Sequence, residues 1–243
     1  MSAAHAPSKR RRWIAAAFAT AAFALFIALG VWQLYRLQWK LDLISRVDAR
    51  VHAAAVDAPA HAQWPRVNRT DDEYRHIRIE GTFLPGHDTL VQATTDLGMG
   101  YWLLTPLRRD DGTIVIVNRG FVPTQWRAHP GAVPPAGAVE VSGLLRISEP
   151  GGAFLRHNDP DAQRWYSRDV DAIATKLQLA DVAPYFIDAN AKPSTSADGY
   201  PVAGITVVSF YNHHLGYALT WFGLALLVAL GAWRAARNER IRT

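Results

Sequence analysis

Two long apolar runs, one near each end of the chain, dominate the pattern of hydrophobic and polar positions. The first extends from Trp13 to about Leu34, and the second extends from Leu215 to Trp233. A helix needs ~20 apolar residues to cross a hydrocarbon core ~30 Å thick, and each run has about this length. The pattern therefore predicts transmembrane helices at residues 13–34 and 213–233, on either side of a polar middle at residues 35–212.

Basic residues lie outside both apolar runs. Lys9–Arg12 precede the first run, and the second is followed by Arg234, Arg237, Arg240 and Arg242. Cytoplasmic flanks of membrane helices collect Lys and Arg, so the tails at residues 1–12 and 234–243 are expected in the cytoplasm and the middle outside it. A cleaved signal peptide is the alternative for the first run. That run exceeds the usual 7–15 apolar residues, and no small-x-small site follows before Trp39, which favours a retained anchor.

The polar middle has the pattern of an α+β domain. Residues 74–83 alternate polar and apolar positions as a strand does, and further strands are predicted at residues 89–93, 101–107, 113–122, 139–147, 185–188 and 205–211. Asp110-Asp111-Gly112 predicts a hairpin turn, because glycine tolerates the positive φ that such a turn requires. Residues 169–179 carry an apolar face typical of a helix, with Ser167 as its N-cap. The expected fold is a mostly antiparallel sheet or small barrel plus a helix, exported between two membrane helices.

The first helix is expected to continue past the membrane. Beyond Lys40, apolar residues recur at helical spacing as an amphipathic extension, at Leu41, Ile44, Val47 and Val51. Within the apolar runs, small residues repeat four apart, as in Ala17/Ala21, Ala24/Ala28 and Ala225/Ala229, and the second run also offers Gly216, Gly223 and Gly231. Small residues let helices approach closely in lipid, so the two helices are expected to pair. The alternative is that Ala and Gly are simply common in membrane helices.

Composition excludes several functional classes. The chain has no cysteine, which removes disulfides, thiol catalysis and Cys-ligated metals. The known motifs of serine hydrolases, phosphate-binding loops and zinc proteases are missing, and a membrane-anchored enzyme is therefore disfavoured. The net charge of +5 owes much to the two tails, and the middle has no dense basic cluster, so no nucleic-acid partner is expected.

The candidate site lies where the exported domain enters the second helix, at Asn212-His213-His214. Ionisable residues at the edge of a bilayer are often functional. His214, Tyr217 and Trp221 follow at i, i+3 and i+7 and so share one helix face. A neutral imidazole there can ligate haem iron, with the aromatic rings covering the macrocycle. The alternative is that both histidines only form hydrogen bonds at the membrane surface.

A second cluster lies where the first helix leaves the membrane. Arg36 is one turn from both Trp32 and Lys40. Its guanidinium can pair with a haem propionate or with an acidic side chain of a partner. The alternative is an interfacial arginine that extends its charged end to the water.

These residues, together with several others, resemble the surfeit locus protein 1 family, in particular its bacterial members. The matching motifs are Gly30-x-Trp32-Gln33-Leu34-x-Arg36-x-x-Trp39-Lys40, Gly81-Thr82-Phe83, Val117-Asn118-Arg119-Gly120-Phe121-Val122-Pro123 and His214-Leu215-Gly216-Tyr217-Ala218-Leu219-Thr220-Trp221. They cover nearly the whole chain in family order. Two positions depart from the family pattern. Phe121 stands where tryptophan is usual, and His213 stands where a second asparagine is common, which adds a potential ligand beside His214.

The resemblance implies an assembly factor for haem-copper (cytochrome c) oxidase in a bacterial inner membrane, with its central domain in the periplasm. It implies haem a as a transient cofactor, with His214 as a ligand of the iron, and subunit I of the oxidase and other assembly factors as partners. A scaffold that holds assembly intermediates without binding haem is the alternative. Asn118-Arg119-Gly120 is expected to be mainly architectural, with Gly120 at a bulge or close approach and Arg119 as a candidate partner contact.

Overall fold

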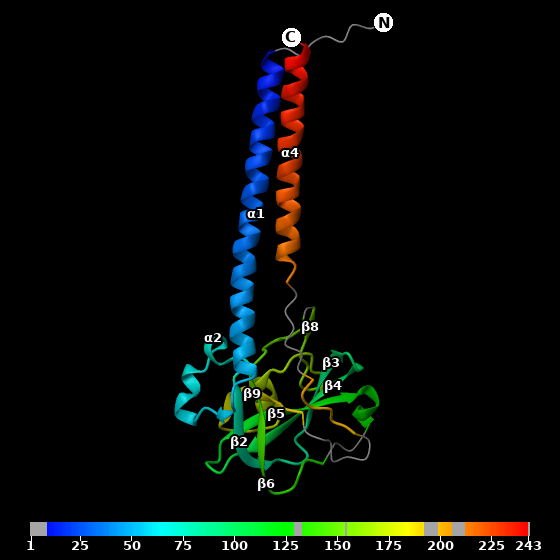
Figure 1. Cartoon of the computed structure of the whole chain (residues 1–243). Helices are drawn as coiled ribbons and strands as arrows, with labels where there is room; N and C mark the ends of the chain where they lie inside the picture. The colour runs from blue at the N-terminus through cyan, green and yellow to red at the C-terminus, as the bar shows by residue number, and fades with distance from the viewer. Residues whose placement is uncertain (1–8, 129–132, 154, 192–198, 206–211, 243) are drawn as a thin grey trace. The chain divides into compact units, whose positions relative to one another are not determined.

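The computed structural model describes residues 9–128, 133–153, 155–191, 199–205 and 212–242. The chain divides into two units, one made of Met1–Arg46 with Ser209–Thr243, and the other of Val47–Val208. The first unit is helical and the second is built around a sheet (Figure 1). This division matches the alternation of apolar ends and polar middle along the chain.

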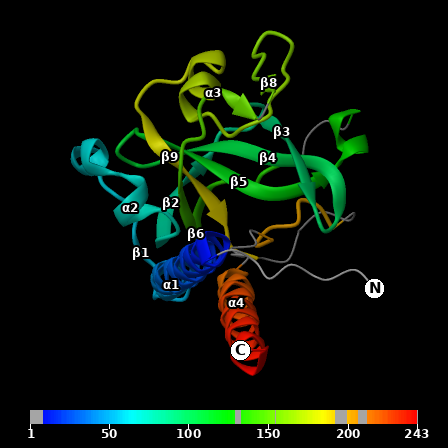
Figure 2. The ribbon, with the colours of Figure 1, turned by 90° about the horizontal axis from the view of Figure 1, so that it is seen from above.

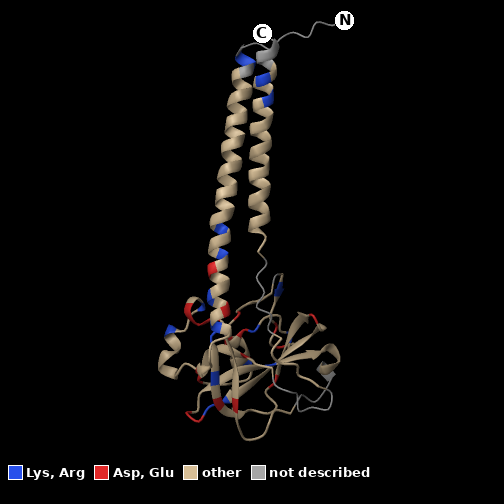
Figure 3. Ribbon diagram, in the orientation of Figure 1, with Lys and Arg blue, Asp and Glu red and all other residues tan. Residues whose placement is uncertain are grey.

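The helical unit contains two long helices that lie side by side. α1 spans Lys9–Val51, and α4 spans His214–Arg242. Within them, Trp13–Val51 and His214–Asn238 are long and apolar enough to cross a membrane. Figure 3 shows basic residues gathered at the helix ends next to the chain termini, with uncharged helix between these and the charges further along α1. The predicted amphipathic extension is confirmed, because α1 runs without a break past Lys40 to Val51.

The second unit is a small barrel. Its sheet has the order β1-β2-β6-β9-β5-β4-β3, and a further pairing of β2 with β4 joins the sheet to itself. The strands are β1 (Val56–Asp57), β2 (His76–Phe83), β3 (Thr89–Thr95), β4 (Gly98–Arg108), β5 (Ile114–Pro123), β6 (Ala138–Ile147) and β9 (Val182–Ala189). Most neighbours are antiparallel, whereas β1 with β2 and β5 with β9 are parallel. The predicted mostly antiparallel barrel is confirmed.

Alternation along β9 directs its side chains into two different apolar clusters. In β9, Tyr185 and Ile187 belong to a cluster that draws on all the strands of the closed barrel, whereas Phe186 between them belongs to the other cluster. Successive side chains of a strand point to opposite faces, so one cluster fills the barrel and the other lies outside it. The outer cluster is covered by α3 (Val170–Lys176), which packs on β9 (Figure 2).

The helix α3 confirms the predicted element but corrects its N-cap. Asp169, not Ser167, is the cap residue, and its carboxylate accepts a hydrogen bond from the backbone N–H of Ala172 at 3.2 Å. The Ser167 hydroxyl instead accepts a hydrogen bond from the backbone N–H of Gly152 at 3.0 Å. Both residue types cap helices well, so local preference alone does not separate them.

The predicted irregularity at Gly120 is present. Leu103 pairs with Gly120 and Leu104 pairs with Asn118, so Arg119 is the extra residue of a bulge between β4 and β5. Gly120 has φ of 132°, and a Cβ there would collide with the backbone of Val202. Both the conformation and the close approach therefore require glycine.

The remaining short elements are η1 (His61–Arg66), α2 (Arg69–Asp72), η2 (Thr124–Ala128), β7 (Gly152–Ala153) and β8 (Arg156–His157). The predicted hairpin turn at Asp110-Asp111-Gly112 is confirmed, and Gly112 has φ of 84°. The strand predicted at residues 205–211 lies almost entirely outside the described residues.

Candidate functional site

The two long helices pack closely along one stripe of each. The Phe26 and Trp221 rings stack with centroids 5.8 Å apart. One turn further along α1, Gly30 lies against Phe222, and a Cβ at residue 30 would approach the phenyl ring within 2.6 Å. On α4, Ala218 and Ala225 are fully buried. The predicted pairing of these helices is therefore present, and the absence of a side chain at Gly30 makes room for an aromatic ring.

The faces that pair agree with the prediction at Ala225, which is buried, but not at the other predicted alanines. On α1, the expected Ala17/Ala21 and Ala24/Ala28 positions are all exposed. On α4, a Cβ at Gly216, Gly223 or Gly231 would meet nothing within 4 Å. Spacing four apart identifies positions that share a face, but it does not say which face meets the partner. Larger side chains such as Phe26 and Trp221 determine this choice.

His214 is joined to α1 by a side-chain hydrogen bond. Its Nδ1 lies 2.8 Å from Oε1 of Gln33, which is buried in the helix pair with 9% exposure. The backbone N–H of His214 donates to Oδ1 of Asn212 at 3.4 Å, so the asparagine side chain accepts a hydrogen bond from the first residue of α4. The imidazole is thus held from α1 through one nitrogen, and its Nε2 has no hydrogen-bond partner among the described residues.

The other predicted site residues are only partly brought together with His214. Trp221 lies in the helix interface, whereas Tyr217 is 57% exposed and lies on the flank of α4. Positions i and i+3 share a face only loosely, and the fully buried residue after His214 is Ala218, at i+4. His213 is exposed, in contrast to the half-buried His214.

Arg36 lies one turn beyond Gln33 on α1 and is exposed. Its guanidinium lies over the ring of Trp39, 4.4 Å from the ring centroid. No hydrogen bond or ion pair joins Arg36 to His214 within the described parts of the chain. An arginine stacked on an indole is held in place while the edge of its guanidinium still carries N–H donors.

The donor set of the helix pair fits a haem better than a bare metal ion. Among the described residues, no group of three or more His, Asp or Glu side chains is arranged to hold a metal ion. A haem iron takes most of its ligands from the macrocycle and needs only one or two from the protein. A single imidazole whose Nε2 has no partner among the described residues meets that need.

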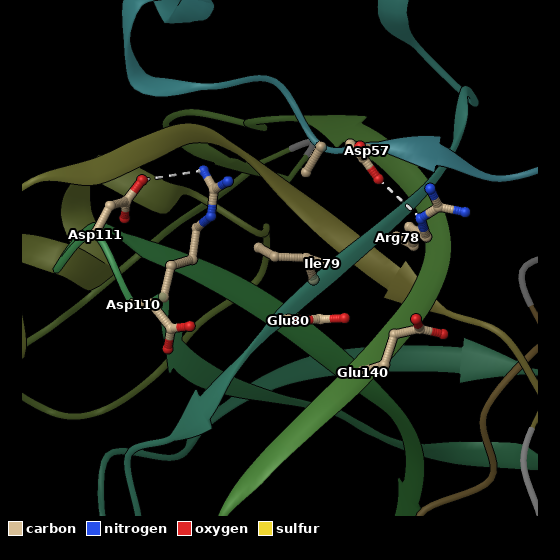
Figure 4. Close-up of a pocket in the computed structure, with 9 residues that line it drawn as sticks. Asp57, Arg78, Ile79, Glu80, Asp110, Asp111 and Glu140 are labelled. Carbon is tan, nitrogen blue, oxygen red and sulfur yellow. Dashed lines mark hydrogen bonds and ion pairs between the residues drawn. The ribbon is translucent and has the colours of Figure 1, made fainter.

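The barrel unit has an open polar groove of about 590 Å³ (Figure 4). Charged side chains line much of it, namely Asp57, Arg78, Glu80, Arg109, Asp110, Asp111 and Glu140. Arg78 donates to Asp57 at 2.8 Å, and Arg109 lies 3.7 Å from Asp111. Ligand sites for large cofactors are mostly apolar, so this groove does not fit a porphyrin. Its lining also offers no histidine or hydroxyl nucleophile.

A buried ion-pair network occupies the barrel wall. The Asp188 carboxylate accepts hydrogen bonds from Asn118 at 2.7 Å and from Arg146 at 2.8 Å. Burial opposes the charge of Arg146, but Asp188 and Glu73 more than compensate and raise its pKa. Asn118 also accepts the backbone N–H of Gly120 at 3.1 Å. These contacts confirm the architectural interpretation of Asn118-Arg119-Gly120.

Arg119 of the same motif is attracted by the half-buried carboxyl group of Asp88. Its guanidinium is 5.6 Å from the ring centroid of Phe83, and burial lowers its pKa against the opposing attraction of Asp88. Burial also raises the pKa of Asp88, while a hydrogen bond from Thr105 partly offsets this rise. The role of Arg119 as a partner contact stays a prediction.

Comparison with known proteins agrees with the motifs. The model of the SURF1 family matches residues 20–226. The chain is 33% identical to surfeit locus protein 1 of Rattus norvegicus over 228 residues, which is 83% of this chain and 71% of the rat protein. It is 30% identical to surfeit locus protein 1 of Homo sapiens over 236 residues, covering 88% and 73% of the two chains. It is also 32% identical to a SURF1-like protein of Monosiga brevicollis over 225 residues, covering 87% and 83%. The family model and these relatives cover most of the chain, and the chain belongs to the SURF1 family.

Proposed function

We propose that this protein is an assembly factor for haem-copper (cytochrome c) oxidase, which binds haem a and passes it on during maturation of subunit I. Family membership supports the general role. The observation that carries the haem-binding part is the His214 imidazole, which is held at Nδ1 by Gln33 and has Nε2 open among the described residues. The protein carries out no catalysis of its own in this proposal.

Three further residues would assist His214. Trp221 packs in the helix pair two turns along α4 from His214, and Tyr217 offers an exposed ring on the flank of α4. Arg36, stacked on Trp39, would pair with a propionate, because a guanidinium binds carboxylates through two parallel hydrogen bonds. The bound haem would supply the redox-active iron that the oxidase needs, and this chain would only hold and present it.

Placement in a membrane is part of the proposal. Two helices are long and apolar enough to span a bilayer, and basic residues follow or precede them at the chain ends. This favours cytoplasmic tails and a periplasmic barrel in a bacterial inner membrane. His214 and Gln33 would then lie near the periplasmic surface of the membrane, where α4 begins.

A scaffold without haem is the second candidate. Large aromatic side chains on α1 remain exposed, with Trp32 at 55% and Tyr35 at 69%. Aromatic residues of this kind are enriched where proteins contact each other and also at membrane surfaces. They would let the helix pair hold oxidase subunits without any ligand on His214.

The absorption spectrum of protein purified from cells that make haem a tests the proposal. We expect wild type to carry haem and His214→Ala to lose it. His213→Ala is the matched control, because the neighbouring histidine is exposed and should be dispensable. If His214→Ala keeps the wild-type spectrum, the ligand assignment is wrong. If none of the three proteins carries haem, the scaffold is favoured.

A further inference from the structure

We propose that Gln33 is a positioning residue for His214, and that it fixes which imidazole nitrogen is free to bind iron. This inference rests on the proposed function, since it deepens the account of the same site. Its starting point is the contact of 2.8 Å between Nδ1 of His214 and Oε1 of Gln33, which joins residues 181 positions apart in the sequence. With Oε1 of Gln33 facing Nδ1, as the structure places it, the contact is a hydrogen bond only if Nδ1 carries the proton, because an amide oxygen accepts and does not donate.

The tautomer of a neutral imidazole is set by the hydrogen bond that one of its nitrogens makes. With the proton held on Nδ1, the lone pair resides on Nε2. Histidines that bind metals almost always donate the other ring N–H to an oxygen acceptor, which orients the ring and makes it a stronger ligand. Gln33 supplies such an acceptor from the opposite helix.

The surroundings of Gln33 favour its hydrogen bond to the His214 ring. Gln33 is 9% exposed and sits in an otherwise apolar stretch of α1, where an unpaired amide would be costly. Gly30, one turn earlier, lets Phe222 of α4 approach and brings the helices together at this level. The backbone N–H of His214 is already engaged by Asn212, so the imidazole is the group left to meet Gln33.

A simpler role for Gln33 would be to link the helices by a satisfied hydrogen bond. The two roles differ in their consequences. A link affects stability alone, whereas a positioning residue also determines the protonated ring nitrogen and the affinity for haem. The test therefore needs a measurement on the protein without haem as well as one with it.

The first measurement is the ¹⁵N NMR spectrum of the His214 ring in full-length protein in detergent micelles, at a pH where the ring is neutral. We expect the proton on Nδ1 in wild type and a shift toward protonated Nε2 in Gln33→Leu. Gln38→Leu is the matched control, because Gln38 is an exposed glutamine of the same helix. An unchanged tautomer in Gln33→Leu would overturn the inference.

The second measurement is titration of the same proteins with ferric iron protoporphyrin IX, followed by absorption. Removing the hydrogen-bond acceptor of a metal-binding histidine typically lowers metal affinity about 10–100-fold, so we expect such a decrease for Gln33→Leu and none for Gln38→Leu. Gln33→Glu keeps an acceptor oxygen and should restore binding, which separates the inference from a general folding defect.

The outcomes separate the two proposals. If His214→Ala loses haem while Gln33→Leu binds it as wild type does, the inference on Gln33 is wrong and the proposed function stands. If His214→Ala binds haem as wild type does, the proposed ligand is wrong, and the role of Gln33 toward haem is overturned with it.

Discussion

At the residue scale, the deeply buried charges of the barrel are held by several partners at once. Asp188 meets Arg146, Arg168 and Asn118, and each arginine has a second carboxylate, Glu73 or Glu149. Burial of a charge is tolerated only when pairing and hydrogen bonds satisfy it. The motif around Asn118 indicated an architectural role, but its partner Asp188 is 70 residues away and no local pattern identifies it.

Because of Tyr185, the stability of the barrel is expected to fall at alkaline pH. Its side chain is completely buried, and its hydroxyl donates to the carbonyl oxygen of Pro59 at 3.3 Å. Burial raises the pKa of Tyr185 to about 12, above the ordinary value of about 10. The unfolded chain therefore ionises first as pH rises. The contribution of Tyr185 to folding is complete below about pH 10 and is lost between about pH 10 and 12.

We expect the free energy of unfolding of wild type to fall more steeply between about pH 10 and 12 than that of Tyr185→Phe. Two pKa units correspond to about 3 kcal/mol at most. At neutral pH the variant should be less stable by about 1 kcal/mol, because one hydrogen bond is lost. Denaturant titrations at several pH values measure both effects, and parallel pH profiles of the two proteins would contradict the prediction.

At the scale of elements, the pairing of α1 with α4 depends on which residues meet, not on how many small residues each helix carries. Gly30 faces Phe222, whereas Gly223 of α4 faces open space. Both glycines lie in apolar helix and look equivalent in the sequence. Packing, rather than the hydrophobic effect, drives helix association in lipid, so only the glycine in the interface should be sensitive to substitution.

Gly30→Leu should weaken the helix pair, whereas Gly223→Leu should not. The leucine at residue 30 has no room beside the Phe222 ring, and overpacking typically costs 1–3 kcal/mol. Thermal unfolding in detergent micelles, followed by far-UV circular dichroism, measures the difference. Equal melting temperatures for the two variants would show that residue 30 is not in the interface.

At the scale of the whole molecule, the apolar ends and their basic flanks predict one topology in the membrane. Both tails should lie on the cytoplasmic side and the barrel on the other. The absence of cysteine makes a direct test possible, because a single introduced cysteine is then the only thiol in the chain.

We expect Leu97→Cys to react with a membrane-impermeant maleimide on intact cells, and Asn238→Cys to react only after the membrane is opened. Leu97 is exposed between β3 and β4, and Asn238 is exposed near the end of α4. Wild type is the blank for both. Labelling of Asn238→Cys in intact cells would place the C-terminal tail outside and exclude the proposed topology.

The sequence alone determined those features that depend on neighbouring residues. Apolar length predicted both long helices, alternation predicted β2, strand-like segments also indicated β3, β4, β5, β6 and β9, and Gly112 and Gly120 marked a turn and a bulge. Such features follow from local periodicity and from the conformational freedom of glycine. Both are properties of neighbouring residues and do not depend on the rest of the fold.

Only the tertiary structure decided which distant residues meet. It closed the barrel through β2 and β4, chose the helix faces that pair, and placed Gln33 against His214. These contacts depend on packing between segments far apart in the chain, where one glycine or one aromatic ring selects among faces of similar composition. For the same reason, the sequence motifs contained both His214 and Gln33, whereas the hydrogen bond between them is visible only in the structure.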